Sequence, residues 1–328
     1  RVFGRSMVDG TGTLALAGRR LTFDLQVKDG QGRSATIAGN ALVGQDQRQV
    51  TVPNLTFAYG RAAWRLASSS TPPTVAWGGE EVSLTPMTFM GPTTDERIAV
   101  SGTWRADGRG ALRVVATRVF LDTIQGGFET PARYGGVMDL DATLGGTRQH
   151  PLVTGRIDIT SGRFRRFSYD RLAGRVDYAG GDFTIDLRLD QAPGVWLVAA
   201  GTVPLSLFDR ELPERPFNVA ITSSQIGLGL LEGVTETVRN VSGQVRLDVR
   251  GVGTSHDPHF QGLIEIGAAA FLVTSTGARY QNGRATLRLA TDRVEVASLH
   301  VEDTGGRSIE VSGSLGTHEM RVGDLEIN

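Results

Sequence analysis

The stretch "VKDGQGRSATIAG", from Val27 to Gly39, recurs near the other end of the chain as "VEDTGGRSIEVSG", from Val301 to Gly313. Six positions are identical in the two stretches, among them an aspartate and an arginine that flank the glycine-containing centre. Each stretch has the composition of a strand, a tight turn and a second strand. Because the same hairpin returns so far along the chain, the sequence predicts a repeating architecture.

The sequence around these hairpins alternates between apolar and polar side chains. In "FTIDLRL" (Phe183–Leu189) every second residue is apolar, and "LTFDLQV" (Leu21–Val27) and "QVRLDVR" (Gln244–Arg250) follow the same rule. Successive side chains of a strand point to opposite faces, so each run predicts a strand with one apolar and one polar face. Turn-forming stretches such as "ADGRG" (Ala106–Gly110) separate the runs.

Three further stretches place apolar residues at their first, third, sixth and eighth positions. They are "VTVPNLTF" (Val50–Phe57), "VSLTPMTF" (Val82–Phe89) and "VEVASLHV" (Val294–Val301). In a regular strand the step of three would turn the last two apolar residues to the opposite face. A β-bulge that absorbs one residue keeps all four on one face, so the spacing predicts a bulge in each strand.

The composition narrows the classes of function. The chain has 328 residues, a net charge of −1, 40% hydrophobic residues and no cysteine. The charge gives no general attraction to nucleic acid, and the lack of cysteine excludes disulfides and thiolate metal sites. No apolar run is long enough for a membrane helix. No hydrolase, metalloprotease or paired-carboxylate motif is present, so we expect a protein that is not an enzyme and uses no cofactor or metal.

A longer repeat relates Gly136–Phe164 to Gly243–Phe271, with glycine, proline, isoleucine and phenylalanine at matching positions. We expect one continuous array over residues 1–328 without autonomous domains, with weak sub-units 1–135, 136–242 and 243–328. The pattern reaches both ends of the chain, which is typical of a segment of a longer protein. Helix signals are scarce: the best is Ile226–Arg239, which glycines interrupt, and the segment 121–135 is weaker, so we expect one or two short helical turns. The stretch "ASSSTPP" (Ala67–Pro73) is typical of a hairpin loop.

Three stretches contain residue types that also occur in binding sites. "HDPH" (His256–His259) has metal-ligand types, "GLGLLEG" (Gly227–Gly233) resembles a phosphate loop, and "RFRRF" (Arg163–Phe167) is basic. The first falls at a turn of the long repeat, and the second lacks both the glycine spacing and the lysine of a phosphate loop. We interpret the third as a solvated strand face.

An alternating sheet must bury its apolar face, and several all-β architectures do so. A sandwich covers the face with a second sheet, a membrane barrel turns it to lipid, and a β-helix stacks short even coils. One-sided alternation, bulges at fixed places and no domain boundary favour a fourth architecture: an elongated curled sheet, antiparallel or mixed, around a U-shaped hydrophobic groove. The predicted groove-lining residues are Leu21, Phe23, Leu25, Val50, Val52, Leu55, Phe57, Val82, Leu84, Met87, Phe89, Phe183, Ile185, Leu187, Leu189, Val245, Leu247, Val249, Val294, Val296 and Leu299.

The order of glycines and alternating apolar residues in Gly243–Ile266, seen again in Gly136–Ile159, resembles the C-terminal region of the TamB family. This family belongs to the AsmA-like group of bridge-like lipid transfer proteins, and similar phrases cover about two thirds of the chain. The resemblance implies the curled "β-taco" groove. It also implies a protein of the Gram-negative cell envelope that is anchored in the inner membrane by a segment outside this chain and crosses the periplasm.

The resemblance further implies a non-enzymatic conduit that carries phospholipid between the inner and outer membranes, with acyl chains as the bound partner. An alternative is a scaffold that assembles outer-membrane β-barrel proteins together with a TamA-like barrel partner. A second alternative is a structural or adhesive β-repeat protein with a closed core. No nucleic-acid partner is expected.

Overall fold

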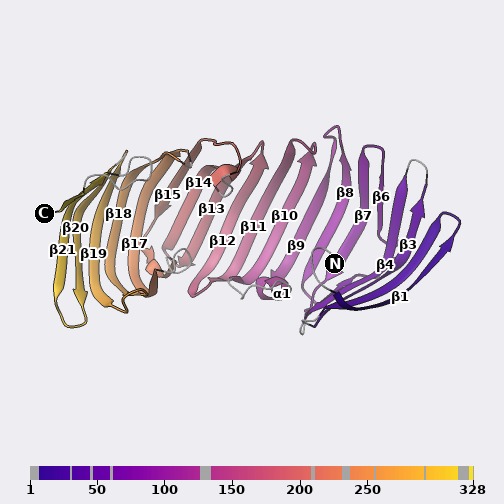
Figure 1. The fold of residues 1–328 in the computed structure, drawn as a ribbon, viewed down its shortest axis with the longest axis horizontal. Coiled ribbons are helices and arrows are strands. Elements are labelled where there is room, and N and C mark those ends of the chain that lie inside the picture. The colour runs from indigo at the N-terminus through magenta and orange to yellow at the C-terminus, as the bar shows by residue number, and fades with distance from the viewer. Residues whose placement is uncertain are drawn as a thin grey trace. The chain divides into compact units, whose positions relative to one another are not determined.

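The computed structural model describes residues 7–29, 32–44, 47–59, 62–125, 134–207, 211–230, 237–254, 256–291, 293–316 and 325–327. The chain is almost entirely β and forms a long antiparallel sheet built from hairpins (Figure 1). This confirms the predicted all-β fold. The chain divides into two compact units, Arg1–Ile157 and Asp158–Asn328, which are described separately below. Strand β11 (Pro151–Phe164) contains the boundary between them.

In unit 1, nearly every strand pairs in antiparallel fashion with the next strand along the chain. Its elements are β1 (Met7–Ala17), β2 (Arg20–Asp29), β3 (Arg33–Val43), β4 (Arg48–Tyr59), β5 (Ala62–Leu66), β6 (Thr74–Gly78), β7 (Glu81–Met90), β8 (Arg97–Arg105), β9 (Gly110–Phe120), α1 (Leu121–Gln125) and β10 (Tyr134–Gly146).

Unit 2 follows the same plan. Its elements are β12 (Phe167–Ala179), β13 (Asp182–Ala192), β14 (Val195–Pro204), the 3-10 turn η1 (Leu205–Leu207), β15 (Phe217–Ser223), β16 (Ile226–Gly227), the 3-10 turn η2 (Leu228–Leu230), β17 (Val238–Gly253), β18 (Pro258–Val273), β19 (Arg279–Ala290), β20 (Arg293–Asp303), β21 (Ser308–Gly316) and β22 (Leu325–Ile327).

The three predicted bulges are present. Between Leu84 and Met87, strand β7 advances three residues while its partner β8 advances two. The same mismatch occurs in β4 opposite Ala38 and Asn40, and in β20 between Val296 and Leu299. The extra residue of each bulged strand restores the side-chain alternation, so the apolar residues before and after the bulge lie on one face.

The segment Ala67–Pro73 is not the hairpin loop that its composition suggested. Strand β5 pairs with the end of β4 and with the end of β7, whereas β6 pairs with the beginnings of the same two strands. β5 and β6 are therefore two halves of one interrupted strand, and the segment between them is an excursion. The break lies at the bulges that contain Pro53 and Pro86, where a regular ladder would need N–H groups that proline lacks.

In the described part of the chain, helical structure is limited to short turns, as expected, but the longest one lies in the other candidate segment. Among the described residues the α-helix is α1, in the segment judged weaker, with Asp122 in its first turn. The preferred segment instead begins with β16 and the single turn η2, and its residues 231–236 lie outside the described part of the chain. Glycines at positions 227 and 229 weaken helix formation there.

Some of the buried side chains lie beside short helical segments. In unit 1 the buried residues Trp64, Ala116 and Val119 pack against half-buried neighbours that include Tyr59 and Ile124 of α1. In unit 2, Ile226 and Leu228 of the segment β16–η2 are almost fully buried. The short helical segments thus cover local parts of each sheet.

The unit 1 cluster also contains a fully buried carboxylate. Glu96 accepts hydrogen bonds from the backbone N–H and hydroxyl of Thr93 (3.3 and 3.2 Å), the N–H of Phe120 (3.1 Å) and the hydroxyl of Thr123 (2.8 Å). Burial raises the pKa of nearby Tyr59, and the charge of Glu96 adds to that rise. Glu96 therefore ties the loop before β8 to the end of β9 and to α1.

Candidate functional site: an apolar concave face in each unit

Strand register places the apolar residues of unit 2 on a single face. Residues directly opposite each other in an antiparallel pair project from the same face of the sheet. One cross-strand row therefore runs through nine strands: Gly174, Leu187, Ala199, Ile221, Val249, Gly262, Leu289, Val294 and Leu315. A neighbouring row contains Leu247, Ile264, Leu287, Val296 and Gly313. We call this side the apolar face of unit 2.

Unit 1 has a corresponding apolar face. A row runs through Leu16, Leu21, Ala41, Val50, Val75, Leu84, Gly102, Leu112 and Leu144. Parallel rows on the same face include Leu25, Ile37 and Leu55, and also Ala35, Phe57 and Trp64. The interrupted strand β5–β6 contributes to the face on both sides of its excursion.

All the residues predicted to line a groove lie on these two faces. Those from Leu21 to Phe89 lie on the apolar face of unit 1, and those from Phe183 to Leu299 lie on that of unit 2. Sequence reasoning missed the intervening strands, where small or aromatic residues interrupt the alternation. These include Ile37, Trp64, Val75, Ile98, Val100, Leu112, Val114, Leu197, Ile221, Ile264 and Leu287.

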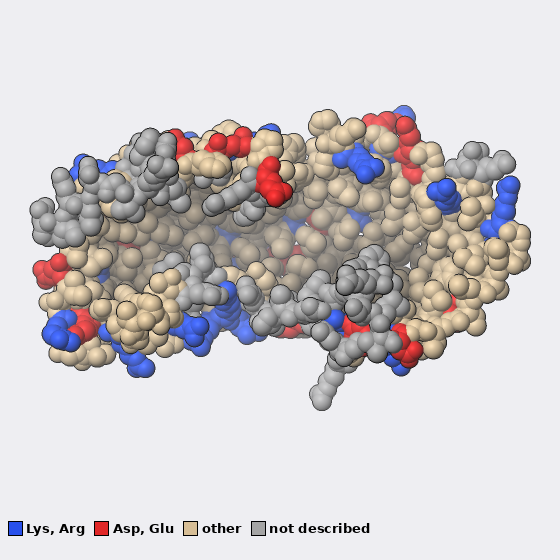
Figure 2. All heavy atoms as spheres, in the orientation of Figure 1, with Lys and Arg blue, Asp and Glu red and all other residues tan. Residues whose placement is uncertain are grey.

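These faces are only partly covered. Phe183, Ile185, Leu187 and Leu189 are half-buried, and Phe57 and Phe260 are 45% and 43% exposed. A sandwich core would bury such side chains against a second sheet. In the part of Figure 2 that holds unit 2, charged side chains gather along the rims and the hollow between them is mostly uncharged.

Glycines on the apolar faces mark where neighbouring strands approach closely. A Cβ atom on Gly201 would lie 2.0 Å from the carbonyl oxygen of Asn218, and one on Gly262 would lie 1.9 Å from that of Asp248. Their φ angles, +143° and +132°, belong to a region that glycine adopts readily. Strand interiors with such glycines can bend sharply, which is consistent with a sheet curled toward its apolar side.

The opposite face of each unit is mostly polar and is crossed by ion pairs between neighbouring strands. Arg113 on β9 forms a two-pronged contact with Asp141 on β10, with Nη2 2.6 Å from Oδ2. The hydrogen bond from Arg113 lowers the pKa of Asp141, and Arg215 lowers that of Asp182 in the same way. This face is therefore suited to water, and the apolar face is not.

Comparison of the chain with protein-family models, curated proteins and solved structures gives no match. Function must therefore be inferred from the geometry. Among the described residues no helix is both long and apolar enough to cross a membrane.

The three other stretches considered in the sequence take structural positions. His256 contacts Glu214 (Nδ1–Oε1 3.0 Å) and His259 contacts Asp257 (Nε2–Oδ2 3.2 Å), both near the β17–β18 turn. No group of three or more metal-ligand side chains occurs in the described part of the chain. In "RFRRF", Phe167 is buried and Arg166 donates to Asn240 (2.9 Å). In "GLGLLEG", residues 227–230 form the end of β16 and the turn η2, and residues 231–233 lie outside the described ranges.

The local cover in unit 2 borders an open cavity with mainly apolar walls. This cavity of about 320 Å³ lies beside η2, lined mainly by apolar side chains such as Leu228, Phe271 and Leu299. A half-covered apolar surface of this kind can shield hydrocarbon from water.

Proposed function

We propose that this chain is a segment of a lipid conduit, in which the apolar face of each unit holds the acyl chains of phospholipid. The observation that carries the proposal is the unbroken row of apolar residues that crosses nine strands in each unit and stays partly uncovered. Each buried CH₂ group of an acyl chain is stabilised by about 0.8 kcal/mol relative to water. Many similar contacts along the sheet would bind a chain without fixing it at one place.

The resemblance to the TamB family supports the same proposal and supplies its setting. That setting is the periplasm of a Gram-negative bacterium, with an inner-membrane anchor outside this chain and an outer-membrane barrel protein as partner. Lipid would then move between the two membranes along successive units. The polar opposite face, with its cross-strand ion pairs, would remain in water throughout.

The test uses a pair of matched variants in unit 2. Leu187→Glu places a carboxylate on the apolar face, whereas Thr184→Glu places one on the polar face of the same strand. We expect phospholipid to co-purify with the unaltered chain and with Thr184→Glu, and to be strongly reduced with Leu187→Glu. Native mass spectrometry measures the bound lipid, and circular dichroism checks that both variants keep their β structure.

Photo-crosslinking separates the lipid conduit from its alternative. A photoreactive residue at Phe183, expressed in cells, should form adducts with lipid. Adducts with polypeptide alone would favour a scaffold for outer-membrane proteins. Absence of lipid from purified protein, together with failure to take up fluorescent phospholipid after delipidation, would rule out the conduit.

A further inference from the structure

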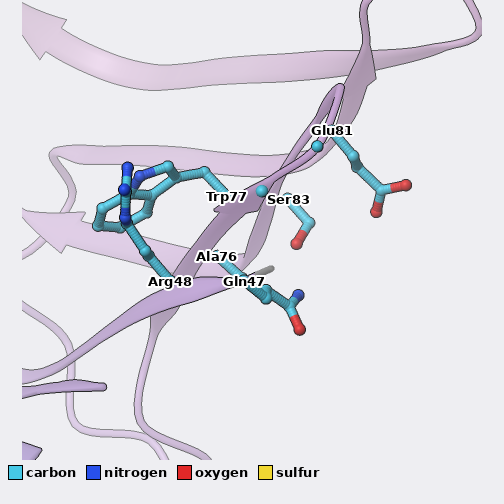
Figure 3. A pocket seen from close by; sticks show the side chains of 8 residues that line it. Gln47, Arg48, Ala76, Trp77, Glu81 and Ser83 are labelled. Carbon is cyan, nitrogen blue, oxygen red and sulfur yellow. The ribbon is translucent and has the colours of Figure 1, made fainter. Parts of the chain in front are cut away.

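A second cavity lies at one rim of unit 1, where β4 and β7 begin and β6 ends. Its volume is about 620 Å³, and its lining includes Gln47, Arg48, Trp77, Glu81 and Ser83 (Figure 3). It combines polar and charged side chains with an indole ring. Register places Arg48 and Trp77 on the apolar face and Glu81 and Ser83 on the polar face, so residues from both faces line the cavity at this rim.

Arg48 occupies an apolar-face position. It pairs with Val43 on β3 and with Trp77 on β6, and Val50, two residues along β4, belongs to the apolar row. Among the described strand positions of the apolar face from β4 to β10, Arg48 is the one charged residue. From β4 to β10 the alternating sequence thus places one cation on a face whose other described strand positions are uncharged.

The charge of Arg48 is not neutralised by a nearby carboxylate in the described structure. Glu81, the acidic residue that lines the cavity, lies 2.8 Å from Arg105 (Oε2–Nε) and so already has a cationic partner. In Figure 3 the side chain of Glu81 points away from Arg48 and Trp77. No hydrogen bond or ion pair joins Arg48 to any other described residue, and its side chain is exposed. The guanidinium is free to bind an anion from outside the protein.

Tryptophans flank this position along the rim. The cross-strand row through Arg48 continues to Trp77, Val82 and Trp104, which places two indole rings on the same face. The indole N–H of Trp104 donates to the carbonyl oxygen of Gly146 (2.7 Å). Indole rings favour boundaries between hydrocarbon and water because they are largely apolar but carry one donor. This row therefore has the composition of a lipid headgroup boundary.

We propose that Arg48, beside Trp77, forms a subsite for the phosphate group of a glycerophospholipid whose acyl chains lie on the apolar face of unit 1. The inference rests on the proposed function and adds a defined place at which the headgroup is recognised. A guanidinium presents paired N–H donors that match phosphate oxygens, and such charge-assisted hydrogen bonds are the stronger ones. Ser83 does not belong to this subsite, because it lies between Val82 and Leu84 on β7 and therefore projects from the polar face.

The experiment compares two fluorescent lipids with identical acyl chains, phosphatidylglycerol and diacylglycerol, which differ by the phosphate-containing headgroup. Each is titrated into the delipidated full chain carrying no change, Arg48→Gln, Arg48→Lys or Arg20→Gln. Arg20 is the matched control because it lies at a strand end of the same unit but on the polar face, since its neighbour Leu21 is on the apolar face.

We expect Arg48→Gln to weaken phosphatidylglycerol binding about tenfold and to leave diacylglycerol binding unchanged. The phosphatidylglycerol affinity of Arg48→Lys should lie between those of Arg48→Gln and the unaltered chain. Arg20→Gln should bind both lipids with the affinity of the unaltered chain. Equal phosphatidylglycerol affinity of Arg48→Gln and the unaltered chain would overturn the subsite while leaving the conduit intact. Failure of every variant to bind either lipid would instead overturn the proposed function.

Inorganic phosphate distinguishes a lipid headgroup from free phosphate. We expect millimolar inorganic phosphate to leave phosphatidylglycerol binding nearly unchanged, because the acyl chains supply most of the affinity of the lipid. If it displaces the lipid from the unaltered chain but not from Arg48→Lys or Arg48→Gln, the site recognises free phosphate and the lipid assignment is wrong.

Discussion

The carboxylate of Asp303 accepts hydrogen bonds from both the backbone N–H (2.9 Å) and the Nε–H (2.7 Å) of Arg307, across the turn between β20 and β21. Asp29 and Arg33 make the same two contacts in the turn between β2 and β3. The repeated sequence phrase therefore encodes a turn clamp. Arg33 is largely buried against its aspartate, whereas the Arg307 side chain is exposed.

This clamp predicts a specific pH dependence. The N–H groups of Arg307 stabilise the ionised carboxyl and hold the pKa of Asp303 below its ordinary value of 3.8. A depressed folded-state pKa contributes stability above the unfolded-state value, and that contribution is lost as the pH falls through the folded-state value. We expect Asp303→Asn to lower the urea midpoint slightly at pH 6 and to flatten its fall between pH 5 and about pH 3.

Asp248→Asn is the control for this pH effect. Asp248 is an exposed carboxyl with no hydrogen bond or ion pair among the described residues. Its removal should leave the midpoint at pH 6 nearly unchanged. A pH profile of Asp303→Asn that superimposes on that of the unaltered protein would show that the clamp does not stabilise the folded state.

Glu96 provides a prediction about the cover over the unit 1 cluster. Glu96→Ala removes the acceptor for four donors that are contributed by Thr93, Phe120 and Thr123. The N–H of Phe120 is half-buried and loses its side-chain acceptor, whereas Thr93 is exposed and the Thr123 hydroxyl can still donate to the carbonyl oxygen of Phe120 (2.7 Å). We therefore expect a loss of about 1–3 kcal/mol of stability. Hydrogen exchange should become faster in residues 93–125.

Asp95→Ala is the matched change, because the Asp95 carboxylate is exposed and lies 3.8 Å from the guanidinium of Arg118. It should alter stability by less than about 0.5 kcal/mol. Equal effects of the two substitutions would show that the hydrogen bonds of Glu96 do not hold the cover in place.

Local patterns were sufficient to predict the apolar faces. Alternation assigns a residue such as Leu187 to one face of its strand without knowledge of the neighbouring strands, and a 1-3-6-8 spacing implies a bulge wherever it occurs. The turn stretches could be located for the same reason, since their glycines and aspartates act within a few residues. Whether the weak sub-units behave separately stays a prediction.

Features that depend on partners distant in sequence could not be predicted in this way. The donors to Glu96 come from a loop, a strand end and a helix, and no short pattern brings them together. The composition of Ala67–Pro73 shows a break in a strand but not whether the chain then reverses or continues; the pairing of β5 and β6 with the same two neighbours decides it. No sequence pattern distinguishes Arg48 from other charges at strand ends, whereas its pairing with Trp77 does.

Strand glycines on the apolar face should tolerate substitution poorly. Gly201→Ala would place a methyl group against the carbonyl oxygen of Asn218 and strain a φ of +143°. We expect a loss of about 1–3 kcal/mol, measured by thermal unfolding. Gly267→Ala is the control, since no atom lies within 4 Å of its added methyl group and its φ is ordinary. If Gly201→Ala unfolds like the control, the strands are not held in the close approach described here.

Register itself can be tested because the chain has no cysteine of its own. Thr184 on β13 and Thr202 on β14 are directly paired on the polar face, so cysteines at these positions should form a disulfide on mild oxidation. Thr184→Cys with Val203→Cys is the slipped pair, and it should crosslink far more slowly because the two side chains point to opposite faces. Non-reducing electrophoresis of the denatured protein measures both yields.

A preference for the slipped pair would mean that the register is shifted by one residue. Such a shift would place Leu187 and its neighbours opposite polar-face residues of β14 instead of its apolar row. The continuous apolar face, and with it the conduit, depends on the first pair forming and the second failing.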